Sequence, residues 1–148
     1  MEEKLRSYGL EVTTQTGQVR AYNGTKLNFK NIIASRNPLE KTRILLCAHW
    51  DTRPYADQDK NSPNTPNLGA NDGGSGVGVL LEIARLLQTG NLKLGVDILL
   101  FDVEDYGNSQ VEDSYCLGSQ YWSKNKHAKN YHPKYSILLD MVGAKNAT

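Results

Sequence analysis

Three nearly continuous apolar runs constrain the fold of this chain more than any other feature. They cover residues 43–47, 95–103 and 135–139, and none shows the strict alternation of a half-exposed strand. Strands that are apolar on both sides are buried on both faces, as in a parallel sheet that helices cover. The runs therefore predict three buried strands at the centre of an α/β domain.

Helix and loop signals separate these runs. Apolar residues recur with helical spacing over residues 73–87, and Gly90 follows as a stop signal. A shorter helix is expected over residues 118–126, and a long loop rich in proline and asparagine over residues 50–70. A loop of that length in a small domain is usually functional or disordered.

The beginning of the chain predicts a hairpin preceded by the end of a helix. Residues 2–9 have the pattern of a helix closed by a C-terminal glycine, Gly9, and we expect a further segment upstream. Residues 12–19 are rich in Thr and Val, and Asn23-Gly24 is a strong hairpin signal. The expected fold is a mixed, mainly parallel central sheet flanked by helices, with an antiparallel hairpin at one edge.

Length and composition exclude several classes of protein. A chain of 148 residues is expected to form one domain, and a net charge of +1 gives no basic excess for nucleic acid. Residues 77–81 and 98–101, the longest apolar runs, are too short for a membrane span, and no signal peptide is recognisable. The two cysteines are too few for a disulfide scaffold. Cys47 is expected in a buried strand and Cys116 in a loop, with their pairing left open.

Each buried strand leads directly into ionisable side chains. Because open α/β sheets place their sites beyond the carboxyl ends of the strands, these side chains are expected to converge in one crevice. Asp72 joins them, since the glycine-rich segment 69–76 opens the helix that crosses between the first two strands. The residues that follow the three strands are His49, Asp51, Glu104, Asp105 and Asp140.

This cluster predicts a bound divalent metal ion. Five carboxylates and one histidine in one crevice would repel strongly, because close like charges oppose joint ionisation. A histidine nitrogen together with carboxylate oxygens suits zinc in an open, catalytic site. Neighbouring residues at a strand end point in different directions, so Asp105 is expected to hold metal and Glu104 to face the substrate as general base.

Taken singly, each of these residues has a plainer interpretation. Asp72 before a glycine run is also a favoured helix N-cap. His49 alone is more often a hydrogen-bonded packing residue. Glu104-Asp105 alone is usually a solvated strand end, and Asp140 alone a turn residue. Their joint position at successive strand ends is what favours the metal site.

The glycine run and two tryptophans support weaker hypotheses. Residues 73–76 could bind phosphate at a helix N-terminus, but the dinucleotide-binding and P-loop motifs are absent, so we interpret the glycines as allowing close backbone packing. Ser75 lacks the sequence context of a hydrolase nucleophile. Trp50 and Trp122 are candidates for a substrate pocket, although such aromatic residues are more often part of a core.

Four segments carry a resemblance to a known family: Ala-His-Trp-Asp at 48–51, Gly-Ala-Asn-Asp-Gly-Gly-Ser-Gly at 69–76, Phe-Asp-Val-Glu-Asp at 101–105 and Leu-Leu-Asp-Met-Val-Gly at 138–143. In this order they resemble the zinc-dependent exopeptidases of peptidase family M28, whose fold the glutaminyl-peptide cyclotransferases (glutaminyl cyclases) share. The long loop between Asp105 and Gly118 resembles the cyclase branch. The family usually has Glu-Glu where this chain has Glu104-Asp105.

The resemblance implies a single, truncated catalytic domain over residues 1–148 with the zinc-exopeptidase (phosphorylase/hydrolase-like) fold. As a zinc-dependent acyltransferase it would convert the N-terminal glutamine of peptides or proteins to pyroglutamate and release ammonia. One zinc ion would be held by Asp72, Asp105 and a histidine beyond residue 148. Glu104 would transfer the proton and Asp140 would orient the reacting groups. A periplasmic or secreted location is expected for the full-length protein, and the oligomeric state stays open.

Two further hypotheses use the same residues. In an M28 aminopeptidase Glu104 would activate a water molecule and Asp51 would orient His49. A third hypothesis, an inactive fragment or a non-catalytic binding module, follows from the absent histidine. In the aminopeptidase hypothesis the two zinc ions would be held by the absent histidine together with His49, Asp72, Asp105 and Asp140.

Overall fold

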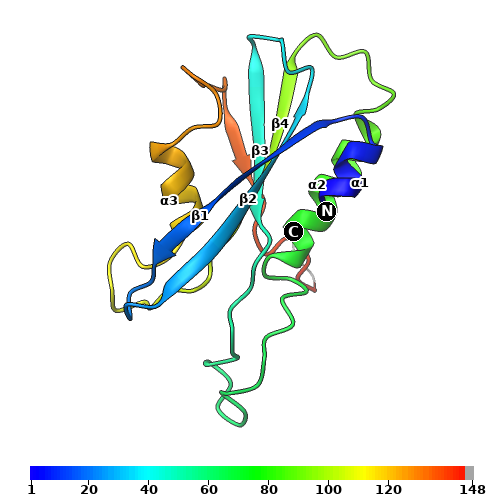
Figure 1. The fold of residues 1–148 in the computed structure, drawn as a ribbon. Helices are drawn as coiled ribbons and strands as arrows, with labels where there is room; N and C mark the ends of the chain where they lie inside the picture. The colour runs from blue at the N-terminus through cyan, green and yellow to red at the C-terminus, as the bar shows by residue number, and fades with distance from the viewer. Residues whose placement is uncertain (146–148) are drawn as a thin grey trace.

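The computed structural model describes residues 1–145, which form a five-stranded mixed sheet with helices on both faces (Figure 1). The strand order is β1-β2-β4-β3-β5, in which β4, β3 and β5 run parallel and the β1–β2 hairpin lies antiparallel at one edge. This confirms the predicted fold class. The strands are β1 (Glu11–Arg20), β2 (Lys26–Arg36), β3 (Arg43–His49), β4 (Gly95–Phe101) and β5 (Ser136–Leu138).

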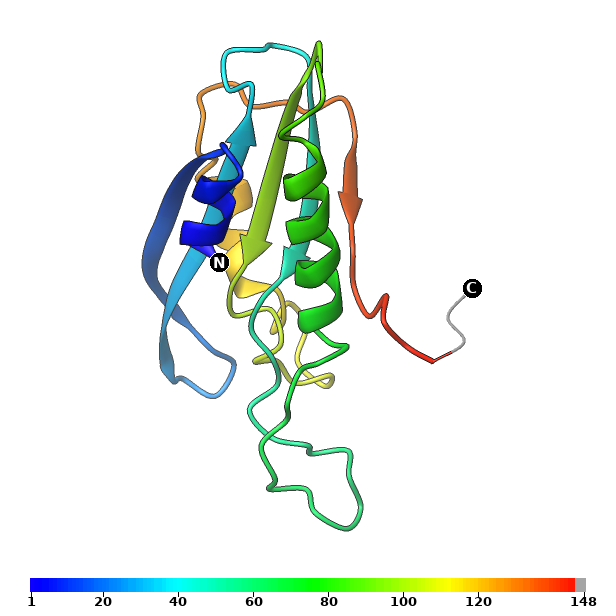
Figure 2. The same cartoon turned by 90° about the vertical axis from the view of Figure 1, so that its right-hand side faces the viewer.

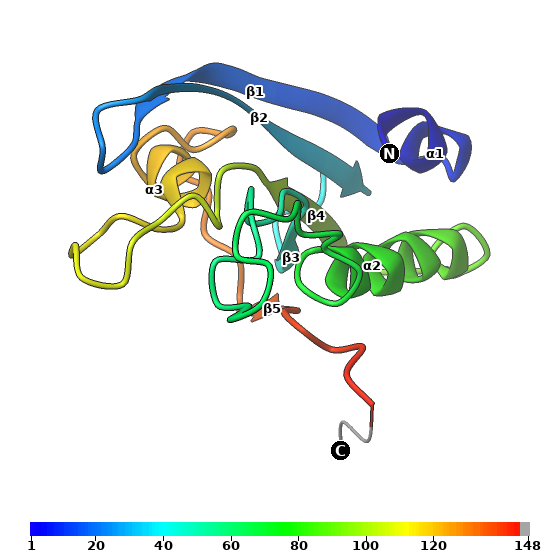
Figure 3. The same cartoon turned by 90° about the horizontal axis from the view of Figure 1, so that it is seen from below.

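The helices divide between the two faces of the sheet. Figure 3 shows α1 (Glu2–Ser7) and α2 (Gly74–Leu86) on one side and α3 (Leu117–Lys124) on the other. The apolar residues of β4 alternate between two clusters: Ile98 and Leu100 pack toward α1 and α2, whereas Leu99 and Phe101 pack toward α3. Every residue of β4 is therefore buried, as a strand covered on both faces requires.

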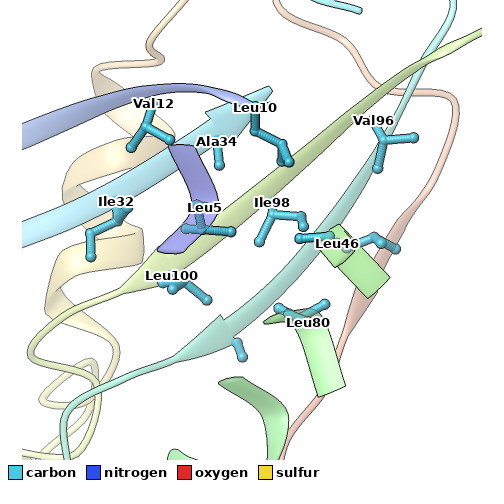
Figure 4. Packing of buried hydrophobic residues seen from close by; sticks show 12 residues of the cluster. Leu5, Leu10, Val12, Ile32, Ala34, Leu46, Leu80, Val96, Ile98 and Leu100 are labelled. Carbon is cyan, nitrogen blue, oxygen red and sulfur yellow. The ribbon is translucent and has the colours of Figure 1, made fainter. Parts of the chain in front are cut away.

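The N-terminal helix is anchored in this core by its own end. The N–H of Gly9 bonds to the carbonyl of Arg6, and the N–H of Leu10 bonds to the carbonyl of Leu5. With Gly9 at φ +77° this is a Schellman motif, and it confirms the predicted glycine cap. Leu5 and Leu10 then pack against strand residues such as Ile98 (Figure 4).

The last strand differs from its prediction. All three residues of β5 are exposed, with Leu138 at 61%, so the expectation of a third buried strand is wrong. The reason is its position: β5 pairs only with β3 and forms the edge of the sheet among residues 1–145. Both cysteines are free, so the pairing of Cys47 with Cys116 is not formed. Within residues 1–145 no helix has the length and apolar character that a membrane span needs.

One buried carboxylate ties the central strands together. Asp97 in β4 is fully buried and accepts hydrogen bonds from Nε and Nη2 of Arg43 at 2.7 and 2.6 Å. The hydroxyls of Ser35 and Tyr131 donate to it at 2.6 and 2.8 Å. Burial raises the pKa of Asp97, but the donors outweigh this and hold the pKa below its usual value.

Substituting Asp97 by Asn or Ala is expected to destabilise the fold by about 3–5 kcal/mol, because Arg43 would remain buried without its partner. Since the pKa of Asp97 is lowered, this stabilisation is complete above the unfolded pKa of about 4 and is lost as the pH falls further. Urea unfolding at several pH values measures both effects. E82Q, which breaks an exposed pair with Arg85, is the control and should show no measurable change.

Candidate metal centre

The carboxyl ends of the parallel strands bring the predicted cluster together at one end of the sheet (Figure 2). His49 is the last residue of β3, and Asp72 lies just before α2. Nε2 of His49 is 2.9 Å from Oδ1 of Asp72 and 3.5 Å from Oδ1 of Asp140. The ligand atoms of His49, Asp72 and Asp140 all lie within 4.8 Å of one another, which is a spacing that one metal ion can bridge.

Asp51 joins the ends of the two central strands. One of its carboxylate oxygens accepts the N–H of Glu104 at 3.0 Å, and the other accepts the N–H of Asp105 at 3.1 Å. Its distance of 3.6 Å from Nδ1 of His49 is longer than a hydrogen bond. Asp51 is therefore placed beside His49, but the contacts in this structure use it chiefly to fix the backbone of Glu104-Asp105.

The acidic surroundings shift the pKa values of the site. Burial lowers the pKa of His49, but the interaction with Asp51 and the negative charges of Glu104 and Asp140 outweigh it and raise the pKa to about 9. Burial, reinforced by the charges of Asp72 and Glu104, raises the pKa of Asp105 to about 6. The pKa of His49 is raised by the carboxylates around it, whereas the pKa of Asp105 is raised first by burial and then by its acidic neighbours.

Several buried polar atoms of the cluster lack a hydrogen-bond partner. They are Nδ1 and Nε2 of His49 and Oδ2 of Asp105; Nε2 lies 2.9 Å from Oδ1 of Asp72, but that contact lacks the geometry of a hydrogen bond. Such atoms are costly to bury unpaired, and a metal ion is one way to satisfy them. An imidazole nitrogen with carboxylate oxygens is a donor set that zinc accepts, so the residues present fit a zinc site.

Close backbone packing holds Asp72 and Asp140 near the histidine. A Cβ on Gly73, which has φ +83°, would lie 2.5 Å from the carbonyl of Asp51. A Cβ on Gly76 would collide with the carbonyl of Leu139. The glycine run thus allows the close approach that the sequence predicted, and neither phosphate binding nor a Ser75 nucleophile is needed to explain it.

Two polar side chains that the sequence analysis missed position the Asp140 segment. The hydroxyl of Ser75 donates to the carbonyl of Asn71 at 2.6 Å and accepts the N–H of Val142 at 3.0 Å. Oδ1 of Asn71 accepts the N–H of Gly143 at 2.8 Å. Their place in the glycine-rich segment was the only signal available, because their partners lie far along the chain.

Arg53 is a further residue that the sequence analysis missed. It pairs with Asp57 through both carboxylate oxygens, and its Nη1 lies 3.5 Å from Oδ1 of Asp105 and donates to the carbonyl of Asp105 at 3.2 Å. A cavity of about 220 Å³ opens beside this pair. Arg53 therefore anchors Asp105 from the long loop after β3. The aromatic side chains that line the cavity are Tyr22, Tyr55 and Tyr106.

The two tryptophans predicted for a substrate pocket lie elsewhere. Trp122 is buried on α3, where its Nε1 donates to Nδ1 of His127 at 3.1 Å and its ring packs against Phe101 and Tyr131. The structure does not bring it to the acidic cluster. Trp50 follows His49, but its ring packs against the apolar cluster on the side of α1 and α2. Its Nε1 donates to the carbonyl of Lys30 at 3.0 Å.

Comparison with known proteins identifies relatives of this chain. The model for peptidase family M28 matches residues 31–148. Glutaminyl cyclase of Porphyromonas gingivalis is 53% identical with a TM-score of 0.96, over 99% of this chain and 52% of that chain. A Zn-dependent exopeptidase from Parabacteroides distasonis is 50% identical with a TM-score of 0.94, over 99% and 53%. Aminopeptidase YwaD of Bacillus subtilis is 30% identical over 82% of this chain and 23% of its own length.

The chain covers only part of each relative. It spans 40% of the first two curated relatives and about half of the two solved structures. Statements about the activity of a whole protein are therefore proposals.

The packing of α2 against the Asp140 segment gives a direct test of the site. G76A is expected to destabilise the chain by about 1–3 kcal/mol, because the new methyl group forces α2 away from Leu139. G78A on the same helix has nothing within 4 Å and should stabilise it by about 0.5–1 kcal/mol. Urea unfolding gives both values, and zinc titration should show weaker binding for G76A alone. Equal stability of the two variants would contradict this packing.

Proposed function

We propose that this chain, which belongs to peptidase family M28, carries the active site of a zinc-dependent glutaminyl-peptide cyclotransferase. The reaction converts an N-terminal glutamine to pyroglutamate and releases ammonia. The observation that carries the proposal is the cluster of His49, Asp72, Glu104, Asp105 and Asp140 at the carboxyl ends of the strands, in a chain 53% identical to a glutaminyl cyclase.

The carboxylates of Asp72 and Asp105 are the ligands that this chain would offer to a single zinc ion. Oδ2 of Asp105 is buried and unpartnered, and the charge of Asp72 acts directly on Asp105. A third ligand, a histidine, would come from the part of the domain outside this chain. When bound, zinc supplies a Lewis acid that polarises the γ-carbonyl of the substrate glutamine.

We assign the proton transfer to Glu104. Its Oε2 lies 4.0 Å from Nδ1 of His49 and so faces the cluster. In the proposed reaction Glu104 takes a proton from the α-ammonium group, the freed amine attacks the γ-carbon, and Glu104 gives that proton to the γ-nitrogen, which leaves as ammonia. The new ring nitrogen gives up its second proton to Glu104, which passes it to solvent, so that a neutral lactam remains. Such transfer contributes about 10²–10⁴-fold to a rate. Because nucleophile and carbonyl belong to one residue, proximity contributes as well.

Asp140 and Glu104 both approach His49, one near each ring nitrogen. The side chain of Asp140 is 45% exposed, so one oxygen remains accessible to a substrate amine while Oδ1 contacts His49. We assign Asp140 the role of accepting a hydrogen bond from the α-amino group and turning it toward the γ-carbon. Asn71 and Ser75 hold the segment after Asp140 in place for this role.

One observation favours a second candidate, an M28 aminopeptidase. His49, Asp72 and Asp140 form a ligand group of their own, and the charge of Asp72 also acts on Asp105, which is outside that group. The chain would therefore offer more ligands than a single zinc ion held by Asp72 and Asp105 uses. In that case Glu104 would take a proton from the attacking water. The 30% identical aminopeptidase of Bacillus subtilis supports this candidate.

Product analysis and metal counting decide between the two functions. We expect glutaminyl peptides to release ammonia, leucyl peptides to release no leucine, and one zinc ion to bind per chain. E104Q should lower the rate by at least about 10²-fold while zinc still binds, whereas D72N should lose zinc binding. E82Q on the exposed face of α2 is the matched control. Leucine release with two bound ions would replace the cyclase by the aminopeptidase.

Zinc binding is also expected to depend on pH in a defined direction. At pH 7 the metal-free chain carries a proton on His49, whose pKa is about 9, and part of the population carries one on Asp105, whose pKa is about 6. A cation beside these groups favours their deprotonated forms, so zinc uptake should release protons and the affinity should rise between pH 6 and pH 9. Calorimetry in buffers of different ionisation enthalpy measures the release. An affinity that stays constant over this range would contradict the assignment.

A further inference from the structure

We propose that Cys116 is a positioning residue for Glu104: its thiol holds Oε1 of the carboxylate and leaves Oε2 to take up and return the proton. Sγ of Cys116 donates to Oε1 of Glu104 at 3.0 Å. This inference rests on the proposed function, because it assigns the proton transfer of that function to one of two oxygens. It also accounts for a cysteine that the sequence leaves without a role.

The local backbone fixes the thiol in this place. The N–H of Cys116 bonds to the carbonyl of Glu104 at 2.8 Å, and the N–H of Leu117 bonds to the carbonyl of Val103 at 2.9 Å. Cys116 immediately precedes α3 and has φ +59°, a left-handed conformation that is uncommon for a residue with a Cβ. Such strain persists where the surroundings determine it, and here the contacts to the end of β4 do so.

The two oxygens of Glu104 have different surroundings. Oε1 meets the Cys116 thiol, and Oε2 faces His49 at 4.0 Å from its Nδ1. Asp51 holds the N–H of Glu104, so the residue is held at its backbone and at its carboxylate together. A carboxylate that is held at one oxygen cannot exchange its two oxygens by rotation without breaking that bond.

The thiol is suited to donate rather than to react. Burial raises the pKa of Cys116 to about 12, and the contact with the negative Glu104 adds to the shift. At neutral pH the group is therefore S–H, which is a weak donor that is strengthened when its acceptor is a carboxylate. Its partner is a single oxygen at short range, so it orients the carboxylate without adding charge to the site.

Orientation is the benefit expected for catalysis. A general base works when the accepting oxygen is already within reach of the proton, and a small misplacement of the carboxylate costs rate. Loss of the thiol would let the carboxylate rotate and hydrate at Oε1, while the substrate contacts would remain. The expected signature is a lower kcat at an unchanged KM.

Two substitutions and one control test the role in the zinc-loaded protein. C116A should lower kcat about tenfold or more, as expected for a lost hydrogen bond to a charged group, and leave KM unchanged. C116S keeps a hydroxyl donor and should recover most of that rate. C47A removes the other thiol, which lies in β3 and contacts the carbonyl of Ile137, and should lower stability without changing kcat. Wild-type kcat in C116A, or no recovery in C116S, would overturn the proposal.

Infrared spectroscopy of the metal-free protein tests the contact independently of activity. The S–H stretching band that C116A removes should lie at lower frequency than the band that C47A removes, because its acceptor is charged and closer. E104A should move it to higher frequency. An unmoved band would overturn the hydrogen bond itself. If the band moves but glutaminyl peptides release no ammonia, the contact stands, whereas the proposed function and the proton role of Oε2 both fail.

Discussion

The parallel pairing of β3 with β4, closed at its end by Asp51, is the constraint on which the rest of the site depends. The two strands are in register as far as His49 and Phe101. The N–H of Trp50 still bonds to the carbonyl of Phe101 at 2.9 Å, and after it the carboxylate of Asp51 continues the connection by accepting two backbone N–H groups. The chain after β4 therefore turns at a fixed position, and Glu104 and Asp105 enter the crevice beside the histidine.

Several features that cost free energy lie close together at this end of the sheet. Val103 adopts φ +51° and Met141 adopts φ +49°, each next to an acidic residue of the cluster. A β-branched residue in this region is strained, and strain of this kind gathers at functional sites. The same crevice holds unpaired buried nitrogens and a carboxyl group of raised pKa. The Arg43–Asp97 pair and the two cores stabilise the sheet that bears these costs.

The sequence was sufficient for the parts of the fold that depend on local pattern. The apolar runs located β3 and β4, Asn23-Gly24 located the hairpin, and Gly9 located the end of α1, because each pattern acts through neighbouring residues. The prediction that β5 is buried was wrong because burial depends on which other elements pack against the strand. The apolar residues of the strand do not reveal those elements.

The site could be predicted only where topology alone decides proximity. The carboxyl ends of parallel strands lie at the same end of a sheet, whatever chain connects the strands. The sequence analysis therefore placed His49 and Asp140 together, although they are far apart in sequence. Other contacts of the site are single hydrogen bonds to partners far along the chain, and no regular sequence spacing predicts them. They are made by Asn71, Ser75 and Cys116. Trp122 shows that closeness in sequence is a weaker guide, since it follows the Glu104-Asp105 pair along the chain but its ring packs in the cluster with Phe101 and Tyr131.

The division of labour between the two neighbouring acids follows from how each is held. Arg53 lies 3.5 Å from Oδ1 of Asp105, whereas Oδ2 is buried without a hydrogen-bond partner. A bound cation would satisfy Oδ2. Glu104 is anchored by Cys116 on one oxygen and leaves the other facing His49 across a partly open space. In both residues one oxygen has a fixed partner, and in the proposed function the second oxygen would bind zinc in Asp105 and transfer the proton in Glu104. Arg53, on the long loop after β3, holds Asp105 at two points, because its Nη1 donates to the backbone carbonyl and lies 3.5 Å from Oδ1 of the side chain.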